Sequence, residues 1–70
     1  MNESEKSKLK ILLTHWIEHN SEHAQEFTKW ADKAKGLKSP GVQEDIMKAV
    51  QLINQANNFL HKASEGLKEK

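Results

Sequence analysis

The chain has 70 residues and a formal net charge of +1, with 11 Lys or Arg residues against 10 Asp or Glu residues, and it has no cysteine. This length predicts one small domain, residues 1–70, and small domains often gain stability by forming oligomers. The balanced charge and the lack of arginine argue against nucleic-acid binding, and no apolar run is long enough to span a bilayer. Without cysteine there are no disulfides or thiolate metal sites, so we expect a soluble, cytoplasmic protein.

A first long helix is predicted from about residue 3 to about residue 35 by its helical period. Asn2 can cap it, with Glu5 as the reciprocal partner three residues later, and no Pro or Gly interrupts the chain before Gly36. Apolar residues recur in steps of four and three, and Asn20 and His23 occupy the two positions missing from that series. The predicted buried stripe is Leu9, Leu13, Trp16, Phe27, Trp30 and Ala34.

A loop is predicted over residues 36–39, followed by a second helix from about residue 40 to about residue 67. Gly36 suits a left-handed position after a helix, Ser39 suits an N-cap, and Pro40 suits the first helical position. The predicted stripe of this helix is Val42, Ile46, Ala49, Ile53, Ala56, Leu60, Ala63 and Leu67. A short loop favours antiparallel neighbours, so the expected fold class is all-α, a hairpin of two long antiparallel helices.

The two stripes predict a register when they are laid against each other. If Ala34 faces Val42, then Phe27 and Leu13 both fall opposite alanines, so sizes are complementary at those layers, as close packing requires. In the same register His23 meets Ile53 and Asn20 meets Ala56. A polar residue in such a seam is typical of a layer that fixes register, which is one interpretation of Asn20 and His23.

Further apolar residues lie beside the predicted seam, where two helices alone cannot cover them. They are Ile11, Leu12 and Ile17 on the first helix and Met47, Val50, Leu52 and Phe59 on the second. A homodimer that forms a four-helix bundle would cover this surface, and a helix of another protein would do so as well. We expect the dimer to form along the flank of Leu12, Leu52 and Phe59, with His19 of both chains near a common two-fold axis.

Three histidines, His15, His19 and His23, are spaced by four residues, within the pattern H-x-x-E-H written twice. Imidazole is the commonest side-chain metal ligand, and four-residue spacing stacks side chains along one helix face. The outer two lie about 12 Å apart along the axis, so only His15 with His19, or His19 with His23, can share an ion. The predicted metal site, for zinc, nickel or cobalt, therefore needs help from Glu22, Glu26, His61 or a second chain.

Each of these residues also has a metal-free interpretation. Glutamates on a helix face are more often solvated, and His61 alone is more often a surface residue. Stacked histidines would repel one another when protonated, which predicts a pH-sensitive patch. The alternative to metal binding is thus a structural or protein-interaction module. We expect no enzyme, because the motif resembles that of inverzincins only in its spacing and two helices supply no substrate cleft.

The run His15-Trp16-Ile17-Glu18-His19-Asn20, continued by Glu22-His23-Ala24 and Glu26-Phe27, resembles a signature of small, uncharacterised prokaryotic helical-hairpin proteins. The resemblance implies the hairpin fold and supplies no mechanism. In the predicted register Asn54, Asn57 and Asn58 lie at the level of the histidines. They are candidates for hydrogen bonds that would orient metal ligands.

Overall fold

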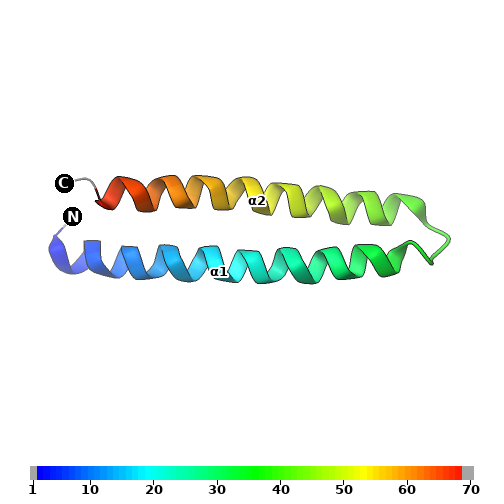
Figure 1. Ribbon diagram of the computed structural model, residues 1–70, viewed down its shortest axis with the longest axis horizontal. Coiled ribbons are helices and arrows are strands. Elements are labelled where there is room, and N and C mark those ends of the chain that lie inside the picture. Colours follow the sequence, from blue (N-terminus) through cyan, green and yellow to red (C-terminus); the bar gives the residue numbers. More distant parts are fainter. Residues whose placement is uncertain (1, 69–70) are drawn as a thin grey trace.

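The structure is a computed structural model that describes residues 2–68. Helix α1, Glu3–Ala34, and helix α2, Pro40–Lys68, run antiparallel and side by side along their whole length (Figure 1). They form a rod that measures 53 × 14 × 13 Å. Within the described part of the chain, neither helix has an apolar stretch long enough for a membrane crossing. The predicted all-α helical hairpin is confirmed.

The two ends of α1 compare differently with the prediction. At the start, Asn2 caps the helix as expected, because its side-chain Oδ1 accepts a 2.8 Å hydrogen bond from the Glu5 N–H. At the other end Gly36 does not take the predicted left-handed conformation. Instead its N–H donates to the Lys33 carbonyl at 3.1 Å, and that of Leu37 donates to the Ala34 carbonyl at 3.0 Å. These tighter bonds satisfy the last carbonyls, so no left-handed residue is needed.

The buried side of α1 is rotated relative to the predicted stripe. Leu13 is buried as expected, but Trp16 and Trp30 are 41% and 55% exposed. Ala24 and Ala31, which immediately follow predicted seam positions, are buried instead. The prediction that both tryptophans anchor the core is therefore wrong. Small side chains at the point of closest contact let the two helix backbones approach, which a tryptophan there would prevent.

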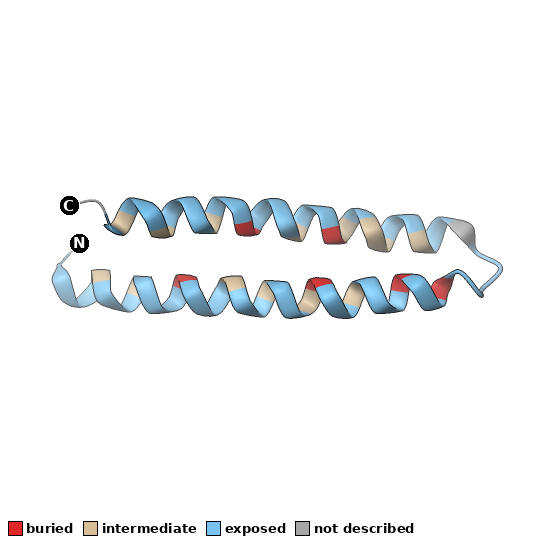
Figure 2. Ribbon diagram, in the orientation of Figure 1, coloured by how far each residue is buried: buried red, intermediate tan, exposed pale blue. Residues whose placement is uncertain are grey.

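Helix α2 is rotated in the corresponding way. Among the side chains of α2 that the structure describes, those of Val50 and Asn57 are buried, each one residue after the predicted Ala49 and Ala56. Ala56 is exposed. Figure 2 shows the buried and half-buried segments of both helices turned toward each other, with exposed surface on their outer sides. The core is thin, since its buried apolar residues are Leu13, Ala24, Ala31, Ala34 and Val50.

A polar layer crosses the middle of this core. The Asn20 side-chain Nδ2 donates to Asn57 Oδ1 at 3.0 Å. The Asn57 Nδ2 donates in turn to the Ile17 carbonyl at 3.3 Å and to Ser21 Oγ at 3.2 Å. Asn20 therefore forms the predicted polar layer, but its partner is Asn57 and not Ala56. The axial register is thus within one residue of the predicted one, while Asn57 belongs to the core and is not a partner of the histidines.

Replacing Asn57 with alanine should lower the free energy of unfolding by about 1–3 kcal/mol, because the partly buried Asn20 amide loses its partner. Urea denaturation at one protein concentration measures this change. Asn58→Ala is the matched control, since Asn58 is exposed on the same helix. Equal stability of the two variants would show that the asparagine layer does not contribute to folding.

Candidate histidine site

The closest approach between titratable side chains on α1 joins two of the predicted ligands. His19 Nε2 and His23 Nε2 lie 3.0 Å apart, and their rings are nearly perpendicular at 88° with centroids 4.4 Å apart. At this distance one imidazole donates a hydrogen bond and the other accepts it. The i, i+4 spacing on an unbroken helix places both side chains on one face, one turn apart. Of the two pairs that the sequence allowed, this one brings ring nitrogens together.

His15 takes a different position in the same row. Its ring stacks on that of His19, with centroids 5.9 Å apart and an angle of 22° between the planes. Stacked rings direct their nitrogens past each other and not to a common point. His15 therefore lies beside the His19–His23 pair without joining it.

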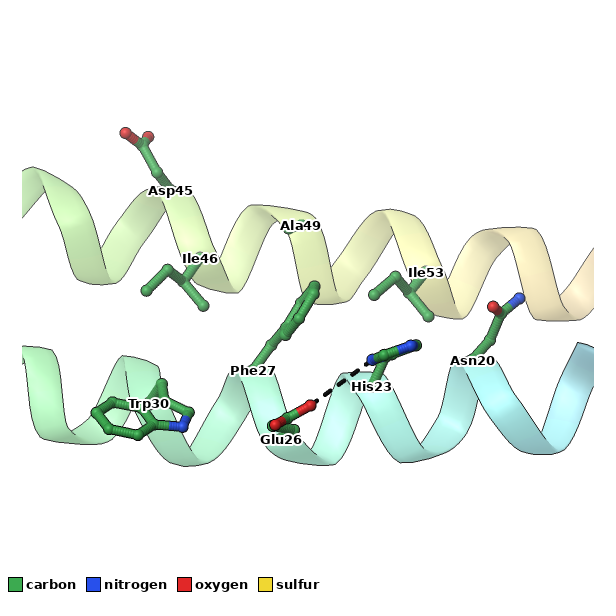
Figure 3. Close-up of a pocket in the computed structure, with 9 residues that line it drawn as sticks. All are labelled: Asn20, His23, Glu26, Phe27, Trp30, Asp45, Ile46, Ala49 and Ile53. Atoms are coloured by element: carbon green, nitrogen blue, oxygen red, sulfur yellow. Dashed lines mark ion pairs between the residues drawn. The ribbon is translucent and has the colours of Figure 1, made fainter.

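Glu26 lies on the far side of His23. Its carboxylate Oε1 is 3.6 Å from His23 Nδ1, the ring nitrogen that faces away from His19 (Figure 3). The His23 ring also lies against Phe27, with centroids 5.9 Å apart. Carboxylate and phenyl ring together limit how the imidazole can turn. Glu26 is therefore placed to orient His23, whereas the sequence suggested it as a direct ligand.

The remaining predicted ligands are not brought to the pair. Glu22 and His61 are exposed, and no hydrogen bond or ion pair joins either to a histidine among residues 2–68. Across that same range, no group of three or more His, Cys, Asp or Glu side chains is arranged to hold a metal ion. One chain thus offers two converging nitrogens and not a complete site.

A groove of about 670 Å³ opens beside His23, between the two helices. Its lining surface is mainly apolar, and Figure 3 shows Phe27 reaching from α1 toward Ala49 of α2. The lining residues are Asn20, His23, Glu26, Phe27, Trp30, Asp45, Ile46, Ala49 and Ile53. Sequence reasoning missed this groove because it placed Trp30 inside the seam. A stripe shifted by one residue, with Ala24 and Ala31 facing α2, would have left Trp30 outside the seam and predicted the groove.

Two exposed aromatic rings on this side of the molecule each lie close to a lysine of their own helix. Lys33 Nζ lies 4.3 Å from the centre of the Trp30 ring, and Lys62 Nζ lies 5.1 Å from that of Phe59. Such cation–π contacts at exposed sites contribute only about 0.5–1 kcal/mol each. The rings remain accessible, at 55% and 67% exposure for Trp30 and Phe59.

Comparison with known proteins identifies a family for nearly the whole helical hairpin. Residues 9–67 match the family described as Domain of unknown function (DUF8180). A protein of Archaeoglobus fulgidus, described as an uncharacterized protein, is 32% identical over 56 residues, which cover 80% of this chain and 89% of that protein. No solved structure matches significantly. These findings agree with the expected resemblance to small, uncharacterised proteins.

Proposed function

The chain belongs to the DUF8180 family, and we propose that it is a non-enzymatic module that binds a divalent transition-metal ion through His19 and His23. The separation of 3.0 Å between their Nε2 atoms is the observation that carries the proposal. Zinc, nickel and cobalt are the ions that imidazole and carboxylate sites favour. A role in metal sensing, buffering or delivery fits a chain of 70 residues.

The geometry of the pair suits two ligands of one ion. With each nitrogen ~2.1 Å from a shared ion, a separation of 3.0 Å corresponds to an angle of about 90° at that ion. Neighbouring ligands of an octahedral ion make an angle of this size. A slightly larger separation of the two nitrogens would give the tetrahedral angle. The ion would replace the hydrogen that the two rings now share. His19 is exposed and His23 half-buried, so an ion can reach both from solvent.

Glu26 supports the same role through His23. A metal-bound histidine usually donates its other ring N–H to a carboxylate, which fixes the tautomer and the ring orientation. The Glu26 carboxylate stands 3.6 Å from His23 Nδ1. Closing that gap by ~0.5 Å would give such a hydrogen bond. It would hold the proton on Nδ1 and leave the Nε2 lone pair for the ion.

Two protein nitrogens alone make a weak site, so further ligands must come from outside one chain. We propose that the protein works as a homodimer, a four-helix bundle in which a second copy completes the coordination. The run from His15 to Phe27 supplies both ligands and the orienting carboxylate, and we expect it to be the stretch that family members share.

Replacing either His19 or His23 with alanine should weaken zinc and nickel binding by at least roughly tenfold, or about 1.4 kcal/mol, because each supplies one of the two converging nitrogens. Calorimetric titration of metal-free protein measures the affinity. His61→Ala is the matched control, since His61 is exposed and forms no contact with the pair among the described residues. Wild-type heats no larger than those of the His19→Ala/His23→Ala double variant would reject the proposal.

A second candidate function rests on the exposed aromatic side chains. Trp30 and Phe59 are both exposed, at 55% and 67%, and exposed apolar surface is typical of interaction sites. In this alternative the module binds helices without metal. The histidine pair then serves as a polar or pH-sensitive patch, because protonation of both rings removes the nitrogen that accepts the hydrogen bond between them. A tight oligomer whose melting temperature a chelator does not change would favour this alternative over metal binding.

A further inference from the structure

The hairpin exposes more surface than a compact protein of its mass. A monomer of 8.0 kDa is expected to expose about 4,450 Å², whereas this chain exposes 5586 Å². The excess of about 1,100 Å² exceeds the ~800 Å² that each partner contributes to an interface of standard size. A two-helix rod cannot bury this surface by itself. The excess is large enough for one side of a stable dimer interface.

Most of the exposed apolar side chains gather on one face. On α1, Trp16 and Trp30 lie seven residues before and after His23, and Leu12 lies one turn before Trp16. On α2, Leu52 lies seven residues after Asp45, a residue that lines the groove. We call this surface the apolar face, and its large exposed residues are Leu12, Trp16, Trp30, Val42, Leu52 and Phe59.

The opposite face of the hairpin is polar by comparison. A shallow depression there is lined by Ser21, Ala24, Gln25, Thr28, Val50 and Asn54. Only two other large apolar residues of the described chain are exposed, Ile11 and Leu37, and neither belongs to the apolar face. The large exposed apolar side chains of the described residues are therefore concentrated on the side that carries His19 and His23.

Leu12 and Trp30 of the apolar face are placed symmetrically about the histidine pair. Leu12 and Trp30 are 18 residues apart, or five whole helical turns, so they point in the same direction. Residue 21 is midway between them and also midway between His19 and His23. On this side of α1, Leu12 therefore corresponds to Trp30 and His19 to His23, whereas Trp16 corresponds to Glu26.

Helix α2 repeats this symmetry at the same level of the rod. Leu52 and Phe59 are seven residues apart, about two turns, and their midpoint is between residues 55 and 56. The hydrogen bond from Asn20 to Asn57 shows that this part of α2 lies beside residue 21 of α1. The midpoint of Leu12 and Trp30 and that of Leu52 and Phe59 thus lie at one level along the rod.

We infer that a second copy of this chain docks on the apolar face by a two-fold axis that crosses the rod at the level of residue 21. The inference rests on the proposed metal function for its ligand set and adds the arrangement of the two chains. A two-fold axis makes each contact twice, with residue i against j and j against i. Here α1 packs antiparallel on the partner's α1, and α2 packs on the partner's α2.

This arrangement gives four of the six residues of the apolar face an apolar partner of suitable size. Leu12 of one copy packs against Trp30 of the other, and Leu52 against Phe59, each pair occurring twice. The partner's Leu12 and Trp16 lie over the groove of about 670 Å³ beside Phe27.

The same axis completes the histidine site. His19 of one chain lies opposite His23 of the other, so the two pairs meet at the axis. Four Nε2 atoms then surround one position, whereas a single chain offers two at 3.0 Å. Four nitrogens suit a closed tetrahedral zinc site. The site is incomplete without the second copy, which explains why no three-ligand group is found within residues 2–68 of one chain.

Engineered disulfides test this arrangement directly, because the chain has no cysteine of its own. The variants Leu12→Cys and Trp30→Cys are expressed singly and together in one cell, then oxidised with diamide, with chelator and with zinc. The co-expressed pair should give cross-linked dimer, since its two cysteines face each other across the axis. Each variant alone should give roughly tenfold less, because its two cysteines lie about 27 Å apart and a disulfide spans ~7 Å at most.

A second pair, Leu52→Cys with Phe59→Cys, tests the same axis on α2 and leaves α1 unaltered. The two-fold arrangement is overturned if wild-type protein is a monomer by light scattering with and without zinc. It is also overturned if a dimer gives no mixed cross-link, or gives equal cross-links from single variants. Mixed cross-links without any heat of metal binding would support the arrangement and reject the metal. Metal binding by a monomer through His19 and His23 would support the metal site and reject the two-fold arrangement.

Discussion

Replacing Leu13 with alanine should lower the free energy of unfolding by about 2–5 kcal/mol, the range for losing a buried leucine side chain. Leu13 is 3% exposed and is the largest side chain among the buried residues of the core. A single core of this size supplies only about 3–5 kcal/mol in total. We therefore expect the variant to be largely unfolded at room temperature, as measured by circular dichroism during thermal and urea denaturation.

The control for this variant is Ile11→Ala, two residues away on the same helix. Ile11 is 70% exposed and lies outside the apolar face. Its replacement should change stability by no more than about 0.5 kcal/mol, as for other surface sites. If the two variants melt together, the core does not lie where the structure places it.

The hairpin and its register could be predicted because several positions fit either phase of the heptad pattern. Leu13, Phe27 and Ala34 belong to the stripe facing α2 in either phase. The caps and the single turn-like segment then set where the helices end. These features depend on local chemistry and period, which a sequence contains.

The facing side of each helix could not be predicted with the same certainty. Trp16 and Ile17, like Trp30 and Ala31, are adjacent apolar residues that lie on opposite sides of the seam centre. Hydrophobicity alone favours burying the tryptophan, but close helix packing favours the small alanine. The Asn20–Asn57 layer was the available signal, because only the observed phase places Asn57 inside with Asn20.

The arrangement of the three histidines could likewise be predicted only in part. Spacing predicts that His15, His19 and His23 are neighbours on one face, and it excludes one ion shared by all three. It does not determine which rings stack and which bring nitrogens together, because this depends on side-chain rotamers. In the structure His23 is held between Glu26 and Phe27, which turns its Nε2 toward His19.

Replacing Leu52 and Phe59 together with glutamate should convert the proposed dimer to monomers. Both side chains are exposed in the single hairpin, at 57% and 67%, so the fold of one chain does not depend on them. Burying a side chain of this size stabilises an interface by roughly 1.5–3 kcal/mol, and the dimer buries four. Placing four like charges near the axis adds repulsion. Together these effects should raise the dissociation constant by at least ~100-fold, or about 2.7 kcal/mol.

The same substitutions should weaken zinc binding although they alter no ligand. A monomer keeps its own His19 and His23 nitrogens, 3.0 Å apart, but loses the two from the partner. We expect at least roughly tenfold lower affinity, or about 1.4 kcal/mol, by calorimetry, with light scattering on the same samples. Ile11→Glu introduces one such glutamate at a site 70% exposed and off the apolar face, and should leave both properties unchanged. Full zinc affinity in a proven monomer would show that one chain holds the whole site, and that the second copy serves only to cover the apolar face.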